Sequence, residues 1–182
     1  TRSLYTITVV NEFLRESTPE KLSSRGISNT ADIEAYRAEA RFVRAYQYWV
    51  LLDLFGNPPF ITEENTIGKV SPEQIKRPEL FSYIEKELLA IEPIIKPAKQ
   101  NEYGRADKGA VWTLLTKLYI NAQVYTGQAK YTEAITYASK IINGGYALAS
   151  SYANLFLEDN YNTSKDEIIF SINYDGVKTR NY

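Results

Sequence analysis

Residues 36–62, YRAEARFVRAYQYWVLLDLFGNPPFIT, decide the fold of this 182-residue chain. Apolar residues recur at alternating steps of three and four, at Ala35, Ala38, Phe42, Ala45, Trp49 and Leu52. This spacing predicts a helix with one buried stripe and deep burial of Trp49. Gly56 ends the helix, and Pro58 and Pro59 cannot continue it, so residues 57–62 form an extended exit.

Similar periodicity predicts four more helices over residues 4–14, 78–91, 107–125 and 131–142. Pro78 suits a first helical turn, Asp107 is a plausible N-cap, and Gly127 stops the helix that Asp107 begins. Leu118 should be deeply buried on that helix. Two antiparallel helix pairs follow, about 31–95 and 107–144, and the second pair resembles a tetratricopeptide unit.

The pattern changes near residue 150. Residues 152–157 suggest a short helix and residues 158–166 a polar loop, while residues 167–174 alternate with period two and predict a strand. We therefore interpret residues 1–182 as a single fragment of a mostly α fold, with tetratricopeptide-like helix pairs and a minor β element in the region 150–182. A lone strand needs a partner, which we expect outside this fragment.

Composition excludes several classes of function. The chain has no His, Cys or Met, so it cannot build a Ser-His-Asp triad, a thiol nucleophile, a His-rich zinc site or a disulfide. Its net charge is −1 and no basic tract interleaves with the aromatic residues, which disfavours nucleic-acid binding. The apolar runs are too short to cross a bilayer, and the first residues lack the architecture of a signal peptide.

Aromatic residues make up 13% of the chain, including 15 tyrosines, a composition that suits binding to the apolar faces of sugar rings. Aromatic residues inside the predicted helices are expected chiefly to pack. The better candidates for ligand contact lie in predicted loops, at Tyr103, Tyr161, Tyr174 and Tyr182. Near Tyr182, the side chains of Asp175, Arg180 and Asn181 could bind sugar hydroxyls.

Two further clusters of polar residues have alternative interpretations. Asp159, Asn160, Asn162 and Asp166 concentrate oxygen donors in one loop, which suits calcium. The loop lacks the Gly and the terminal Glu of an EF-hand, so a solvated turn with capping roles is the favoured interpretation. Adjacent acids such as those at 63–64 and 158–159 have no surrounding apolar run, so a glycosidase pair is not evident. Arg37, Arg41 and Arg44 share one side of the long helix and should pair with acids or loop carbonyls.

The stretch 36–62 and four further ordered motifs resemble the SusD/RagB family of outer-membrane nutrient-binding lipoproteins. The four motifs are RPELFSYIE at 77–85, GRADKGAVWTLLTKLY at 104–119, YTEA at 131–134 and EIIF at 167–170. Family members are much longer, so the chain resembles their central tetratricopeptide-like portion, without the lipidated N-terminal Cys.

The resemblance implies a non-catalytic protein on the extracellular face of the outer membrane that captures an oligosaccharide for a SusC-like TonB-dependent transporter. The helix pairs would dock on that transporter, and loops after residue 174 would contribute to a shallow glycan platform that includes Tyr182. No cofactor is expected, apart from the calcium that the oxygen donors of residues 159–166 would suit. The alternative is a tetratricopeptide scaffold that binds a peptide. The helices of this chain expose mixed charge, whereas such peptide-binding grooves commonly carry a basic or Asn-rich lining, so this alternative is not favoured.

Overall fold

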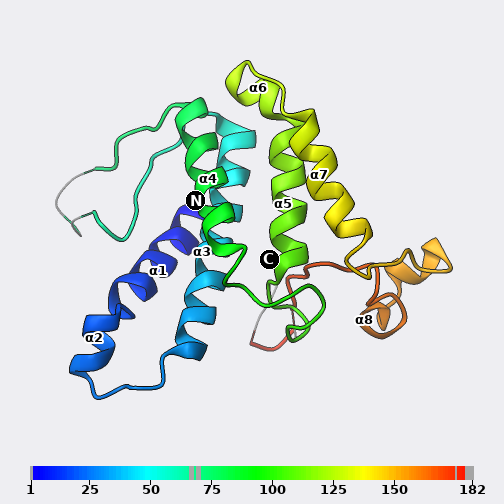
Figure 1. Ribbon diagram of the computed structural model, residues 1–182, viewed down its shortest axis with the longest axis horizontal. Coiled ribbons are helices and arrows are strands. Elements are labelled where there is room, and N and C mark those ends of the chain that lie inside the picture. Colours follow the sequence, from blue (N-terminus) through cyan, green and yellow to red (C-terminus); the bar gives the residue numbers. More distant parts are fainter. Residues whose placement is uncertain (1, 66–67, 69–70, 175, 179–182) are drawn as a thin grey trace.

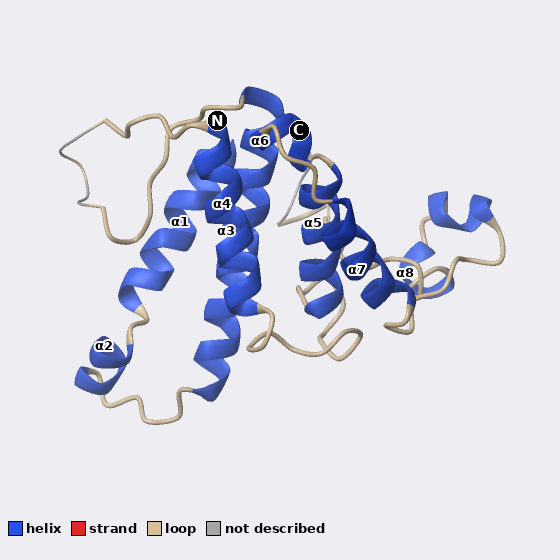
Figure 2. Cartoon of the chain, turned by 45° about the horizontal axis from the view of Figure 1, so that its top comes forward, coloured by secondary structure: helices blue, strands red, loops and turns tan. Residues whose placement is uncertain are grey.

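The computed structural model describes residues 2–65, 68, 71–174 and 176–178 of a mostly helical chain, as the sequence predicted (Figure 1). Its helices are α1 (Arg2–Glu16), α2 (Pro19–Ser24), α3 (Ala31–Phe55), α4 (Arg77–Ile91), α5 (Lys108–Ile120), α6 (Ala122–Thr126), α7 (Tyr131–Ile142) and α8 (Asn160–Thr163), with a 3-10 helix η1 at Tyr152–Phe156. Figure 2 draws every other described segment as a loop.

Two helix pairs form the body of the molecule. Helix α3 packs against α4 and also against α1, while α5 packs against α7 (Figure 1). The core lies within and between these pairs, where apolar side chains of α4 and α5 meet those of α3. Its largest fully buried members include Phe42, Tyr48, Phe81, Leu88 and Leu115. None of the helices in the described ranges is both long and apolar enough to cross a membrane.

The long helix α3 buries the predicted stripe with one change of register. Ala38, Phe42, Ala45 and Leu52 are buried, but the fully buried aromatic residue is Tyr48, and Trp49 is only partly buried. The prediction of deep burial for Trp49 is therefore wrong. Helical steps of three and four lead from Ala45 to Leu52 through position 48 or through position 49. Tyr48 takes the buried position because its hydroxyl forms hydrogen bonds with a buried backbone group. The Tyr48 Oη atom donates to the Ile61 carbonyl at 2.6 Å and accepts from the Ile61 N–H at 2.9 Å.

Most of the predicted helix ends are found in the structure, but one predicted helix is broken into two. Pro78 lies in the first turn of α4, Gly56 and Gly127 follow α3 and α6, and Asp107 caps α5. The helix predicted over 107–125 is instead two helices, because Asn121 leaves the helical conformation between α5 and α6. Its Nδ2 atom donates to the Lys117 carbonyl at 3.1 Å, a local bond typical of asparagine at helix ends. Leu118 is fully buried, as predicted.

The strand predicted over residues 167–174 does not form. Among the described residues of this segment the backbone pairs with no neighbouring strand, and the one isolated bridge joins Pro59 and Gln74 elsewhere. Alternation alone cannot make a strand without a partner. Instead, Ile169 and Phe170 pack on the helical core, so the segment returns beneath α5 toward α3 (Figure 1).

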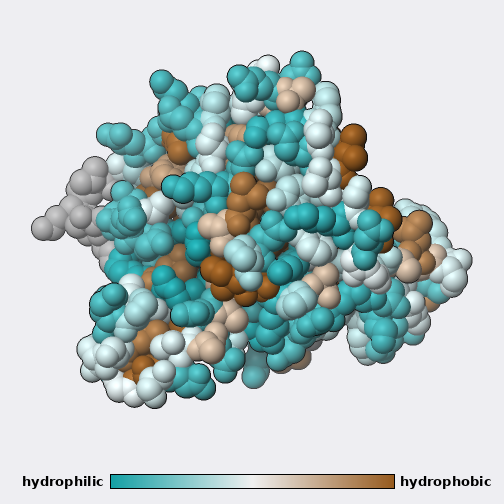
Figure 3. Space-filling model, viewed as in Figure 1, coloured by the Kyte–Doolittle hydropathy of each residue, from teal (hydrophilic) through white to brown (hydrophobic). Residues whose placement is uncertain are grey.

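The outer face of α7 carries large apolar residues. Tyr131 and Ile135 are mainly exposed, and Ala134 is the one residue of this helix that is buried. Ile142 adds to the same exposed face, and Figure 3 shows apolar residues at the surface over this part of the molecule. Helix α7 therefore packs on α5 through Ala134 and Tyr137, and presents other large apolar residues to solvent.

Candidate functional site

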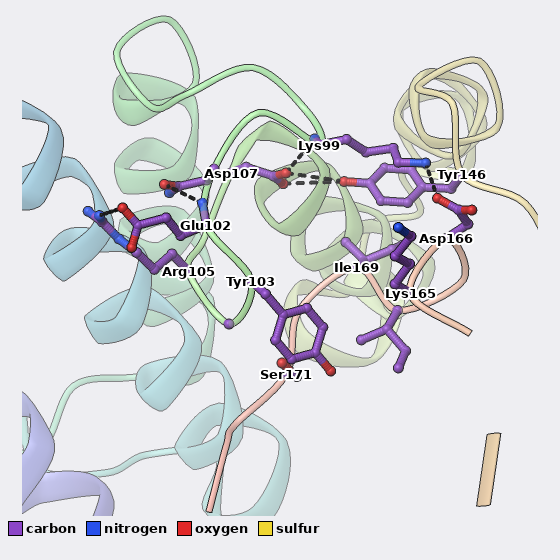
Figure 4. A pocket seen from close by; sticks show the side chains of 13 residues that line it. Lys99, Glu102, Tyr103, Arg105, Asp107, Tyr146, Lys165, Asp166, Ile169 and Ser171 are labelled. Atoms are coloured by element: carbon purple, nitrogen blue, oxygen red, sulfur yellow. Dashed lines mark hydrogen bonds and ion pairs between the residues drawn. The ribbon is translucent and has the colours of Figure 1, made fainter. Parts of the chain in front are cut away.

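A groove of about 320 Å³ lies where the loop between α4 and α5 faces the segment after α8 (Figure 4). The loop contributes residues 99–107 and the second segment contributes residues 165–171, with Tyr146 between them. Its charged lining residues are Lys99, Glu102, Arg105, Asp107, Lys165 and Asp166. Its volume is at the lower end of the range of small-ligand sites, and its lining is mostly polar and charged.

Asp107 organises the inner wall of the groove. Its Oδ1 atom accepts the N–H groups of Gly109 at 2.8 Å and Ala110 at 3.2 Å, which caps α5. Its Oδ2 atom accepts the Lys99 N–H at 2.7 Å, so the same carboxylate holds the preceding loop. The Tyr146 hydroxyl donates to both oxygens at 3.3 and 3.4 Å. Burial, reinforced by the charge of Asp107, raises the pKa of Tyr146, so the phenol stays protonated.

Lys99 closes one end of the groove. Its backbone has a φ of 61°, which is uncommon outside glycine, and its Nζ atom donates to the Gly145 carbonyl at 2.8 Å and to Asp166 Oδ1 at 2.6 Å. The hydrogen bond from Lys99, followed by its charge, lowers the pKa of Asp166. The acid therefore stays ionised, and the contact joins segments that are 67 residues apart.

Arg105 holds the tip of the loop from the opposite side. Its Nε and Nη2 atoms donate to Glu39 of α3 at 3.1 and 2.6 Å, a two-point contact that fixes the guanidinium plane. Gly104 has a φ of 82°, and a Cβ atom there would lie 2.2 Å from the Asn173 side chain. Glycine at this position therefore lets residues 103–105 approach the segment after α8 closely.

Two of the loop tyrosines singled out in the sequence meet beside this groove. The rings of Tyr103 and Tyr161 lie 6.4 Å apart between centroids, at an interplanar angle of 55°. The residues are 47% and 52% exposed, respectively. Tyr103 projects from the loop toward the chain around Ser171, away from the bonded network of Asp107 (Figure 4).

Four of the other predicted glycan contacts belong to residues 175–182. Asp175, Arg180, Asn181 and Tyr182 lie outside the described residues, and their role stays a prediction. Tyr174 is described and is 56% exposed at the end of the segment that lines the groove.

The residues predicted to bind calcium have other contacts. Asp166 binds Lys99, Asn160 Nδ2 donates to the Leu155 carbonyl at 2.9 Å, and the Asp159 carbonyl accepts the N–H of Asn162 at 2.9 Å in helix α8. In the part of the chain that the structure describes, no three acidic side chains gather at one point. Calcium binding by this loop stays a prediction.

Sequence reasoning missed most of the groove because its walls come from distant segments. Asp107 was recognised only as a cap, and nothing local indicated that Lys99 or Tyr146 would reach it. A useful signal was present in Asn101-Glu102-Tyr103-Gly104, where an exposed aromatic residue stands next to a glycine in a polar turn.

Comparison with known proteins finds both similar sequences and similar structures. No family model matches the chain. It is 43% identical over 180 residues to the starch-binding protein SusD of Bacteroides thetaiotaomicron, an alignment that covers 98% of the chain and 31% of that protein. The chain therefore spans about a third of that relative's length.

Solved structures of the same group share the fold. A SusD superfamily protein from Bacteroides fragilis superposes with a TM-score of 0.76 at 21% identity, over 96% of this chain and 36% of that one. Surface glycan-binding protein A from Bacteroides uniformis gives a TM-score of 0.74 at 23% identity, over 92% of this chain and 36% of that one. At these identities the likeness concerns the fold alone.

Proposed function

The chain belongs to the SusD/RagB family, as its helical motifs predicted, and we propose that it is part of a protein that binds an oligosaccharide without cleaving it. The observation that carries the proposal is the 43% identity to a starch-binding protein along nearly the whole chain. A groove bordered by exposed tyrosines and polar side chains supports it, because sugars present both apolar ring faces and hydroxyl groups.

The proposal extends to a place in nutrient uptake. The protein would hold its glycan on the extracellular face of the outer membrane and pass it to a SusC-like TonB-dependent transporter. Attachment to the membrane would come from an N-terminal lipid anchor alone. The paired helices support this arrangement because stacked helix pairs form a rigid, extended surface on which a large partner can dock.

Glycan binding is tested with the full-length protein on a glycan array, followed by calorimetric titration with the best ligand. We expect saturable binding to at least one oligosaccharide class and none to unrelated peptides. Binding to peptide ligands alone would overturn the proposal in favour of a tetratricopeptide-type scaffold.

The transporter is tested separately. An affinity tag on the full-length protein should recover a TonB-dependent transporter from detergent-solubilised outer membranes. Recovery of the tagged protein without any transporter, under conditions that preserve glycan binding, would remove the partner from the proposal and leave the binding function intact.

A further inference from the structure

Tyr103 and Tyr161 form an aromatic pair beside the groove that has no role in packing the core. Each residue is about half exposed, so neither ring contributes to the core as Tyr48 or Tyr119 does. The tilt of 55° between the rings leaves ring surface of both residues open to solvent. Exposed aromatic pairs on loops cost solvation without stabilising a core, which marks them as candidates for ligand contact.

The backbone beneath Tyr103 is held firmly. Asn101 Nδ2 donates to the Ala106 carbonyl at 2.7 Å, which closes the turn around the tyrosine, and its Oδ1 atom accepts the Glu102 N–H at 3.0 Å. Arg105 ties the same turn to Glu39 of α3. Because the turn is already ordered, binding on the ring would require little further loss of conformational freedom.

The backbone beneath Tyr161 is held in a different way. Tyr161 lies in the short helix α8, which begins after Asp159 and whose first residue, Asn160, is bonded to the Leu155 carbonyl. The ion pair between Lys99 and Asp166 joins the end of this region to the loop that carries Tyr103. The two rings therefore belong to separate segments whose relative position is fixed by bonded contacts.

The charges around the pair balance. Three cationic side chains line the groove, Lys99, Arg105 and Lys165, against three anionic ones, Glu102, Asp107 and Asp166. Lys99 and Arg105 are already engaged by Asp166 and Glu39. A balanced wall with bonded cations offers no net attraction to a polyanion, whereas its oxygens and amines suit hydroxyl groups.

We propose that Tyr103 and Tyr161 form a sugar-binding pair that takes neutral pyranose units of an oligosaccharide at the mouth of the groove. The inference rests on the proposed glycan-binding function and adds to it a pair of contacts and a ligand class. The ring faces pack on the apolar faces of the sugars, and the two phenolic hydroxyls bond to sugar hydroxyls.

The test is affinity electrophoresis of the full-length protein in gels that contain amylopectin, laminarin or polygalacturonate. The variants are Tyr103→Ala, Tyr161→Ala and Tyr103→Phe, with Tyr5→Ala as the matched control because Tyr5 is a 74% exposed tyrosine on α1, outside the groove lining. Circular dichroism should show the same helix content and the same thermal midpoint for all of them, since the replaced rings are exposed.

We expect retardation of the wild-type protein by a neutral glycan. Tyr103→Ala and Tyr161→Ala should each weaken that binding about 5- to 100-fold, the range known for loss of one stacked aromatic ring in nucleic-acid sites, while Tyr103→Phe weakens it less and Tyr5→Ala leaves it unchanged. Equal binding by wild type and both alanine variants would overturn the pair and leave the proposed function standing. Retardation only by polygalacturonate would overturn the neutral ligand class, and retardation by no glycan here or on the array would overturn the proposed function itself.

Discussion

At the scale of single residues, the buried guanidinium of Arg44 is the group that most needs charged and polar partners, because it is a charge removed from water. The residue is only 2% exposed, and it donates to Asn11 Oδ1 at 2.7 Å and to Glu87 Oε2 at 3.0 Å, with a further ion pair to Glu63. Arg41 shares Glu87 through two bonds of 3.0 and 2.8 Å. The predicted pairing of these arginines with acids is thus confirmed, and the acids come from other elements than α3. This cluster connects α1, α3, α4 and the loop after α3.

Removal of the Arg44 charge should be costly. Arg44→Ala leaves Glu87 and Asn11 buried without that partner, and we expect the free energy of unfolding to fall by about 3–5 kcal/mol. Chemical denaturation of the full-length protein measures it. Arg25→Ala is the matched control, because the Arg25 pair with Glu16 is largely exposed and its loss should change stability little. If the free energy of unfolding falls by the same amount in both variants, the Arg44 cluster contributes no more to stability than an exposed ion pair does.

The same cluster predicts acid sensitivity. Burial alone would raise the pKa of Glu87, but hydrogen bonds and charge from Arg41 and Arg44 outweigh it and hold the pKa below the ordinary value of 4.5. A carboxyl whose pKa is lowered in the folded state contributes stability above pH 4.5, and that contribution is lost as the pH falls through the folded pKa. Glu87→Gln should therefore flatten a plot of melting temperature against pH on its acid side, below about pH 5, and leave the plot near neutral pH unchanged in slope. An unchanged acid slope would assign the sensitivity to other groups.

Gly109 predicts an effect opposite to helix propensity. Alanine is the better helix former by about 1 kcal/mol, yet a Cβ atom at position 109 would lie 1.9 Å from the Tyr146 hydroxyl oxygen. Gly109→Ala should therefore destabilise the protein, by about 1–3 kcal/mol, because the packed phenol must move. The control is a double variant: in a Tyr146→Ala background the same glycine change should be neutral or stabilising. Destabilisation of equal size in both backgrounds would contradict the clash.

At the scale of elements, periodicity and end signals were sufficient where a helix has one clear face. Helix α7 begins and ends at the predicted residues, 131 and 142, and Asp107 caps α5 as its position indicated. The choice between Tyr48 and Trp49 depended on the Ile61 backbone, and the break at Asn121 on a local side-chain bond, neither of which periodicity contains. The segment 167–174 alternates like a strand, but its conformation is determined by the packing of its side chains on α3.

Phe170 anchors that segment. The centroid of its ring lies 5.3 Å from that of Phe42, edge-on, and 6.4 Å from that of Tyr46, and with residues of α3 and α5 it lines a second pocket. Phe170→Ala should increase amide hydrogen exchange over residues 166–174, with a stability loss below the roughly 3–5 kcal/mol of a fully buried phenylalanine. Ile172→Ala, at a 60% exposed position in the same segment, is the control and should leave exchange unchanged. Equal exchange in both variants would mean that the segment is held by other contacts.

At the scale of the whole molecule, polar contacts join the two helix pairs around the apolar core. Glu92, after α4, accepts from Trp112 Nε1 at 2.8 Å, from the Tyr137 hydroxyl at 3.2 Å and from Lys140 Nζ at 2.6 Å. Lys130 reaches Glu85 of α4 at 2.7 Å. The fold class could be predicted from the sequence because each helix carries its own pattern. The groove could not, because its geometry arises only when the pairs dock and bring residues such as Lys99 and Asp166 together.

The docked arrangement also bears on catalysis. Glycoside hydrolysis needs a carboxylic acid with a raised pKa and a second carboxylate across the sugar. In the groove, Asp107 is committed to the cap of α5 and to Tyr146, and the pKa of Asp166 is lowered by Lys99. Glu102 is largely exposed and lies 3.6 Å from Arg105. The described acids of the groove thus lack the environment of a general acid.

We therefore expect the full-length protein to leave its glycan intact. Prolonged incubation with the bound oligosaccharide should release no new reducing ends, measured by a reducing-sugar assay and by mass spectrometry of the recovered ligand. The Lys99→Ala variant sharpens the test, because it frees Asp166 from its cation. It should still give no cleavage, since Asp107 in the facing loop remains bonded to the cap of α5 and to Tyr146. Release of reducing ends that persists through purification and disappears in Asp166→Asn would identify a catalytic acid here and replace the binding-only function.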